Sequence, residues 1–73
     1  MASHRVESEV TGNVWKIVVN VGDSVLAGDV LIILESMKME IPLESPAAGR
    51  VAELLVGPQD VVEEGQVLVI IGA

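Results

Sequence analysis

The chain has 73 residues, no cysteine and a formal net charge of −7, which excludes a disulfide-stabilised framework and makes nucleic acid and anionic membrane surfaces unfavourable partners. No apolar run approaches the roughly twenty residues of a membrane-spanning helix, and Met1 to Arg5 lead into no apolar signal-peptide core. We therefore expect a single domain over residues 1–73, located in the cytoplasm. Most of the hydrophobic residues are valine, isoleucine and leucine, and Trp15 is the only aromatic residue, a composition that predicts an all-β fold.

The two halves of the chain repeat one pattern at an offset of 37 residues, as from Gly12 to Gly49. Four segments coincide without gaps: residues 12–14 with 49–51, 17–19 with 54–56, 23–25 with 60–62, and 28–33 with 65–70. Each half reads as four short strands separated by turns rich in glycine and aspartate. The repeat predicts about eight strands related by a pseudo-twofold axis, with halves at about residues 5–35 and 42–72. The apolar runs Val30 to Leu34 and Val67 to Ile71 would be equivalent core strands.

Two features depart from a regular strand pattern. Gly22 in the first half is matched by Gln59 in the second, so the second copy of this turn is built differently or holds a strained residue, because glycine alone takes a positive φ without steric cost. Pro42 and Pro46 fall in or just after a predicted strand. Since proline cannot donate a hydrogen bond to a neighbouring strand, they indicate a sheet edge or a strand end.

Trp15 takes the position that Ala52 takes in the second half, next to Val14 and Ile17. We interpret it as a core residue that fills space between the sheets. Aspartates recur at the predicted turns, where their short side chains accept hydrogen bonds from nearby backbone amides. We interpret three of them as turn formers and not as metal ligands: Asp23, Asp29 and Asp60.

The segment that joins the two halves runs from Glu35 to Glu40 and has a counterpart only at the chain ends. The repeat therefore predicts a hairpin at one end of the molecule and the two termini near the other. Its turn would be Met37-Lys38, where hairpins prefer Asn-Gly or Asp-Gly. Exposed methionines often mark recognition surfaces, and a local rule broken at one place often marks a site. An ordinary solvated lysine is the alternative; we favour a functional site at Lys38.

The string Glu-Ser-Met-Lys-Met-Glu from Glu35 to Glu40, which follows an apolar strand and precedes Ile41-Pro42, resembles the attachment site of biotinyl domains. The similarity covers about residues 5–72 and is closest to free-standing biotin/lipoyl attachment proteins and biotin carboxyl carrier domains. It implies a barrel-sandwich hybrid, a flattened β-barrel of two four-stranded antiparallel sheets with the modified lysine on a hairpin turn. Ser36 stands where alanine is commoner in this family.

The resemblance implies that Lys38 carries biotin in an amide bond, attached by a separate biotin protein ligase. It also implies a biotin carboxyl carrier that shuttles carboxybiotin between the biotin carboxylase and carboxyltransferase sites of a biotin-dependent carboxylase, and that is not itself an enzyme. Met37, Met39, Glu35 and Glu40 would be recognition residues for these partners. We expect a monomer without catalytic residues, bound metal, or a nucleic-acid or membrane partner.

Two alternatives remain open. A lipoyl carrier shares the fold and holds lipoate on the equivalent lysine, although its attachment sequence usually carries Asp-Lys-Ala in place of Met37 to Met39. An unmodified barrel-sandwich interaction module would explain the fold without a role for Lys38.

Overall fold

The computed structural model describes residues 3–72, which form eight β-strands and no helix. The strands are β1 (Ser3–Glu7), β2 (Gly12–Ile17), β3 (Ser24–Val25), β4 (Val30–Ser36), β5 (Met39–Glu44), β6 (Gly49–Leu54), β7 (Val61–Val62) and β8 (Val67–Gly72). The predicted all-β fold is confirmed. The described part of the chain holds no candidate for a membrane-crossing helix.

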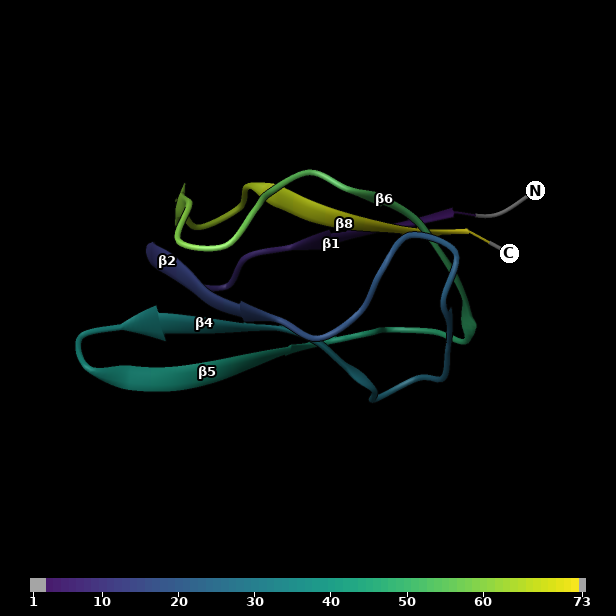
Figure 1. Ribbon diagram of the computed structural model, residues 1–73, viewed down its shortest axis with the longest axis horizontal. Coiled ribbons are helices and arrows are strands. Elements are labelled where there is room, and N and C mark those ends of the chain that lie inside the picture. The colour runs from purple at the N-terminus through teal and green to yellow at the C-terminus, as the bar shows by residue number, and fades with distance from the viewer. Residues whose placement is uncertain (1–2, 73) are drawn as a thin grey trace.

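The strands form two four-stranded sheets that pack as two layers (Figure 1). One sheet has the order β1-β8-β6-β3 and the other β5-β4-β2-β7, and every pairing is antiparallel. At the 37-residue offset that relates the two halves, each strand of the first sheet is equivalent to the strand at the same place in the second sheet. Each sheet therefore contains two strands from each half, so the halves interlock and neither can form its sheet alone.

The core between the sheets is built mainly by the central strands β4 and β8, which share one burial pattern. Leu31 and Ile32 are adjacent in β4, yet both are fully buried. A β-bulge explains this, because Leu31 is the extra residue between the pairs that Val30 and Ile32 make with β5. Leu68 is the equivalent extra residue in β8. The full set of buried hydrophobic residues is Val6, Val14, Val19, Val25, Leu31, Ile32, Leu34, Leu43, Val51, Val62, Leu68, Val69 and Ile71.

The three aspartates act in the turns as predicted. Each carboxylate accepts a hydrogen bond from the backbone amide three residues earlier: Asp23 from Asn20 at 2.8 Å, Asp29 from Leu26 at 2.9 Å and Asp60 from Gly57 at 2.7 Å. The side-chain oxygen of Gln66 does the same for Glu63 at 3.0 Å in the fourth equivalent turn. Among residues 3–72 no group of three His, Cys, Asp or Glu side chains is arranged to hold a metal ion.

Gln59 takes the strained conformation that its mismatch with Gly22 indicated. Its φ is 68°, against 96° for Gly22, and its amide is held by a 2.9 Å hydrogen bond to the carbonyl oxygen of Val14. The prolines also lie as predicted: Pro42 is on β5, at the edge of its sheet, and Pro46 follows the end of that strand.

Gln59→Gly is expected to raise the free energy of unfolding by about 1 kcal/mol, because the left-handed region costs a residue with a Cβ atom about 1–2 kcal/mol and glycine's greater unfolded-state entropy offsets part of the gain. The reverse change, Gly22→Ala, is expected to lower it by a similar amount. Urea unfolding followed by circular dichroism measures both. A destabilised Gln59→Gly variant would contradict the strain assigned to this turn.

The interpretation of Trp15 as a core residue is wrong. Its side chain is 48% exposed, while the neighbouring Val14 is fully buried. Trp15 is the extra residue of a β-bulge in β2, between the pairs that Val14 and Lys16 make with β4, and Ala52 is the equivalent extra residue in β6. Since Val14 already takes the inward position, Trp15 points to the outer surface of the sheet.

Candidate functional site

Lys38 lies in a two-residue turn between β4 and β5. The last cross-strand pair is Ser36 with Met39, which leaves Met37 and Lys38 as the turn. Their φ angles are 51° and 63°, the combination of a type I′ turn, which matches the twist of the flanking strands. The predicted hairpin is thus present, with two residues carrying Cβ atoms where glycine or asparagine is usual. The turn sequence is unfavourable for this backbone conformation, which indicates that these two residues have a functional role and not a structural one.

Among residues 3–72, the most exposed large hydrophobic side chain lies in this turn. Met37 is 91% exposed and Met39 64% exposed, and Lys38 is exposed as well. The molecule measures 36 × 19 × 18 Å, and Figure 1 shows the β4–β5 turn at one end of the long axis and the start of β1 and end of β8 toward the other. Ser3 and Gly72 are paired there. The Lys38 side chain can therefore enter a recess in another protein without steric conflict from the rest of the sandwich.

The base of the hairpin is held by the segment before β2. The Ser36 hydroxyl donates a 2.9 Å hydrogen bond to the carbonyl oxygen of Thr11, and the Thr11 hydroxyl accepts one of 3.2 Å from the amide of Glu64. Gly12 lies against the backbone so closely that a Cβ there would overlap the carbonyl oxygen of Glu35. These contacts fix the direction in which the turn projects.

Sequence reasoning missed Thr11 as part of this support. In the sequence, Ser36 differs from the family only in standing where alanine is commoner, and its hydrogen-bond partner lies 25 residues away. No local pattern around Thr11 indicates a contact of that range. The repeat did align Gly12 with Gly49, and Gly49 makes the same close approach to the carbonyl oxygen of Gly72; that alignment was the available signal for a tight position.

The four predicted recognition residues lie together on this hairpin. Glu35 pairs with Glu40 across the two strands, and because Leu34 is buried, alternation places both carboxylates on the outer face of the sheet. Met39 pairs with Ser36 and lies on the opposite face, just beyond the core. The lysine is therefore flanked by methionines at the tip and by two acidic side chains one step back.

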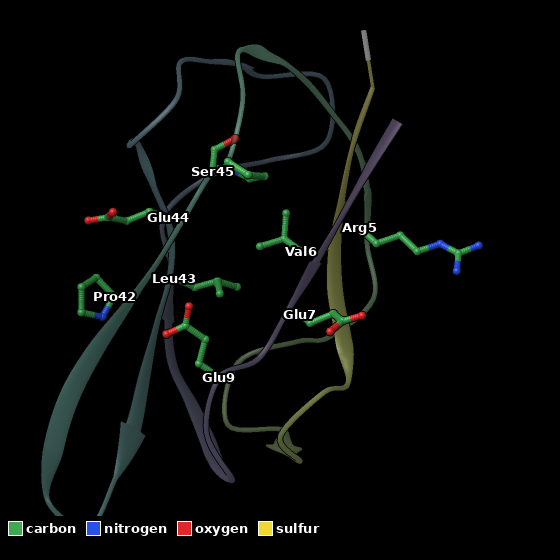
Figure 2. A pocket seen from close by; sticks show the side chains of 9 residues that line it. Arg5, Val6, Glu7, Glu9, Pro42, Leu43, Glu44 and Ser45 are labelled. Atoms are coloured by element: carbon green, nitrogen blue, oxygen red, sulfur yellow. The ribbon is translucent and has the colours of Figure 1, made fainter. Parts of the chain in front are cut away.

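A groove of about 490 Å³ opens between the edge strands β1 and β5, which are equivalent strands of the two halves. Figure 2 shows Val6 and Leu43 pointing toward each other in it, while Arg5 points away. Both Val6 and Leu43 belong to the core. The groove contains none of the five residues predicted for the site, so the hairpin and the groove are separate features.

Residues 2–71 match the biotin/lipoyl family model, whose description reads "Biotin-requiring enzyme". The chain belongs to the biotin/lipoyl family. The predicted role of a biotin carrier domain is thereby confirmed. The fold prediction, including its flattened barrel-sandwich form, is also confirmed.

Individual members of the biotin/lipoyl family support this assignment over nearly the whole chain. The chain is 42% identical to the biotinylated protein TB7.3 homolog of Mycobacterium leprae over 66 residues, which are 90% of this chain and 93% of the relative. It is 44% identical to the biotin/lipoyl attachment protein of Bacillus subtilis over 63 residues, 86% of each chain.

Larger members of the biotin/lipoyl family contain a segment of the same kind. The crystal structure of the urea carboxylase of Kluyveromyces lactis superposes on this chain with a TM-score of 0.93 at 39% identity. The match covers 99% of this chain but 6% of that one. The chain also spans 4% of the urea amidolyase of Saccharomyces cerevisiae, to which it is 36% identical. The shared unit is thus a small part of each of these enzymes.

Proposed function

We propose that Lys38 is the attachment point of biotin, and that a separate biotin protein ligase acylates it. The observation that carries the proposal is the Met37-Lys38 type I′ turn, which holds an exposed lysine at one end of a rigid sandwich. In the acylation step the Lys38 ammonium loses one proton, and its Nζ atom bonds to the carbonyl carbon of biotinyl-adenylate. The bond from that carbon to the phosphate oxygen breaks, AMP leaves, and the nitrogen loses a second proton. Within this proposal the ligase accepts both protons.

The residues present fit an amide-linked group at this position. An exposed Nζ atom can be acylated without unfolding, and no core contact depends on its charge. Acylation removes one positive charge and makes the domain one unit more negative than its −7. When bound, biotin supplies a ureido nitrogen that can accept and release a carboxyl group. The role of the chain is to hold the end of the tether and to raise the local concentration of the tethered ring at partner sites.

Within this proposal, the partners are a biotin carboxylase and a carboxyltransferase. The urea carboxylase of Kluyveromyces lactis, which contains a homologous unit, supports this assignment. Met37 and Met39 would contact these partners or the ligase through flexible, polarisable side chains. Glu35 and Glu40 would meet basic residues there. We further propose that residues 1–73 act as one domain with halves at about 5–35 and 42–72, as a monomer in the cytoplasm.

A second candidate is lipoate on the same lysine. It is favoured by the shared family model and by the name of the Bacillus subtilis relative, a biotin/lipoyl attachment protein. The amide chemistry at Nζ would be the same, and only the recognising ligase would differ. An unmodified interaction module explains neither the family assignment nor the strained lysine turn.

The test is acylation of the purified chain. With a biotin protein ligase, ATP and biotin, the intact mass is expected to rise by one biotinyl group and the product to bind streptavidin, with peptide mapping placing the group on Lys38. A parallel reaction uses a lipoate ligase and lipoate. Modification by lipoate alone favours the second candidate, and no modification in either reaction rejects an attachment function.

A further inference from the structure

The pseudo-twofold axis allows the outer faces of the two sheets to be compared position by position. They differ in exposed apolar surface at two pairs of equivalent positions. On the sheet that carries Lys38, the outer face presents Trp15 and Val61, which are 48% and 76% exposed. The equivalent positions of the other sheet hold Ala52 and Ser24. The second sheet forms with a small residue and a polar residue at these two positions. We infer that the exposed apolar side chains of Trp15 and Val61 are not required for folding.

Register and burial place these residues on one face. Val14 is fully buried, so its neighbours Asn13 and Trp15 point outward from β2. Asn13 pairs with Val61 on one side and with Glu35 on the other. Trp15, Val61 and Glu35 therefore share the outer face of one sheet, with Asn13 between the last two.

The second sheet gives an independent check on the position of Trp15. A Cβ built on Gly72 would lie 3.7 Å from the Cβ of Ala52. Gly72 is the equivalent of Glu35, and Ala52 is the equivalent of Trp15. By the pseudo-twofold axis, the Trp15 side chain begins beside that of Glu35, on the strand that leads directly into the Lys38 turn.

We name the surface made by Trp15, Ile33 and Val61 the Trp15 face. Ile33 is half-buried and pairs with Lys16, so one lysine lies on this face as well. Toward the turn the face continues into the paired carboxylates of Glu35 and Glu40 described above. An apolar centre with a charged margin is the usual anatomy of a protein–protein interface.

We propose that the Trp15 face is the surface on which the biotin protein ligase docks while its active site takes up Lys38, an inference that rests on the proposed function. A standard specific interface buries about 800 Å² per partner, which the two turn residues alone cannot supply. The contact must therefore extend from the turn onto a flank of the hairpin. The Trp15 face is the flank on which symmetry is broken in favour of exposed apolar surface.

The distances agree with a single contact area. Val14 pairs with Leu34, which lies four residues before Lys38, so at most about 13 Å of chain separates Leu34 from the turn lysine. A circular patch of about 800 Å² has a radius of about 16 Å, so an interface centred near the turn reaches Trp15. Tryptophan is also among the residues that most often dominate the binding energy of an interface.

The ligase is the partner that this geometry favours. It must bring the Nζ atom of Lys38 itself to the reacting carbonyl carbon, so the body of the domain has to lie within one lysine side chain of the ligase active site. Later partners receive a ring on a longer arm and can act with the sandwich further away. The complementary ligase surface would be an apolar recess with basic side chains facing Glu35 and Glu40.

The test replaces the two exposed residues by those of the symmetric positions. Trp15→Ala is expected to raise the KM for the full-length carrier in the ligase reaction about tenfold, and Val61→Ser about threefold, with kcat changed less than about twofold in both. Trp15→Phe keeps most of the apolar area and is expected to recover most of the loss. Leu55→Ala is the matched control, because Leu55 is also 48% exposed but follows β6 on the other sheet; its KM is expected to stay within about twofold.

Circular dichroism and thermal unfolding of each variant separate docking from folding. If Trp15→Ala lowers the Tm strongly, Val61→Ser decides, since its side chain makes few contacts to lose. Unchanged KM values in both variants, with the original chain biotinylated normally, would overturn the docking surface alone. An equal KM increase in Leu55→Ala would also overturn it, because apolar surface anywhere would then matter. Failure to biotinylate the original chain rejects the proposed function and this surface with it.

Discussion

Lys38→Arg is expected to abolish biotinylation completely, with no streptavidin binding and no increase in intact mass after incubation with ligase, ATP and biotin. A guanidinium stays protonated under all conditions in which the ligase works and cannot form a stable amide. The residue is exposed and sits at the tip of the hairpin, so the Tm is expected to stay within about 2 °C, as for a surface substitution. The charge at the tip is retained.

The chain supplies its own control for this experiment. Lys16 is the only other lysine; it is exposed and lies on β2 of the same sheet. Lys16→Arg keeps the positive charge beside the Trp15 face, and its biotinylation is expected to reach completion at the end point of the reaction, whatever the effect on its rate. Modification that survives Lys38→Arg but disappears in Lys16→Arg would move the attachment point to β2 and overturn the assignment of the turn.

Gly12→Ala is expected to lower the free energy of unfolding by about 2–3 kcal/mol, the upper part of the range for overpacked sites. Its new Cβ would overlap the carbonyl oxygen of Glu35 and come within 3.1 Å of the Ser36 Cβ. Both neighbours belong to β4, whose backbone cannot move aside without disturbing its pairing with β5. For a domain of this size the Tm should fall by about 10–20 °C, measured by circular dichroism.

Gly57→Ala is the matched control for this substitution. A Cβ there meets only the Asp60 carboxylate, at 3.7 Å, which is ordinary contact, so the Tm is expected to change by a few degrees at most. Gly49→Ala, the symmetric counterpart of Gly12→Ala, should lose a similar amount of stability because its Cβ would overlap the carbonyl oxygen of Gly72. If the Gly12→Ala protein were as stable as the Gly57→Ala protein, the β4 backbone would be able to move away from the new Cβ atom, which would contradict this prediction.

The same pair of glycines illustrates what a repeat in a sequence can and cannot predict. The alignment of Gly12 with Gly49 showed that both positions have one structural role. It did not show what approaches them, since Glu35 and Gly72 come from strands that pair only in the folded state. Likewise, strand positions followed from the chain pattern, whereas the exchange of strands between halves appears only in the sheet order.

Trp15 shows where a residue-by-residue interpretation fails. A large aromatic residue among apolar neighbours such as Val14 and Ile17 is typical of a core position. Strand alternation does not predict which face of the sheet its side chain is on, because a bulge interrupts the alternation. The bulge arises from the register between β2 and β4, which depends on contacts across the sheet. Its outward direction therefore could not be predicted from β2 alone.

By itself, the sequence determined the all-β class, the eight-strand repeat, the hydrogen-bonding role of the turn aspartates and the position of the lysine hairpin, because each depends on local conformational preference or on periodicity along the chain. The tertiary structure decided which strands share a sheet, which residues become bulges, and which of two symmetric faces exposes Trp15 beside the hairpin. It also decided that Ser36 and Thr11 hold the hairpin base. These features depend on pairing between distant segments, and that pairing is fixed only when both sheets close over one core.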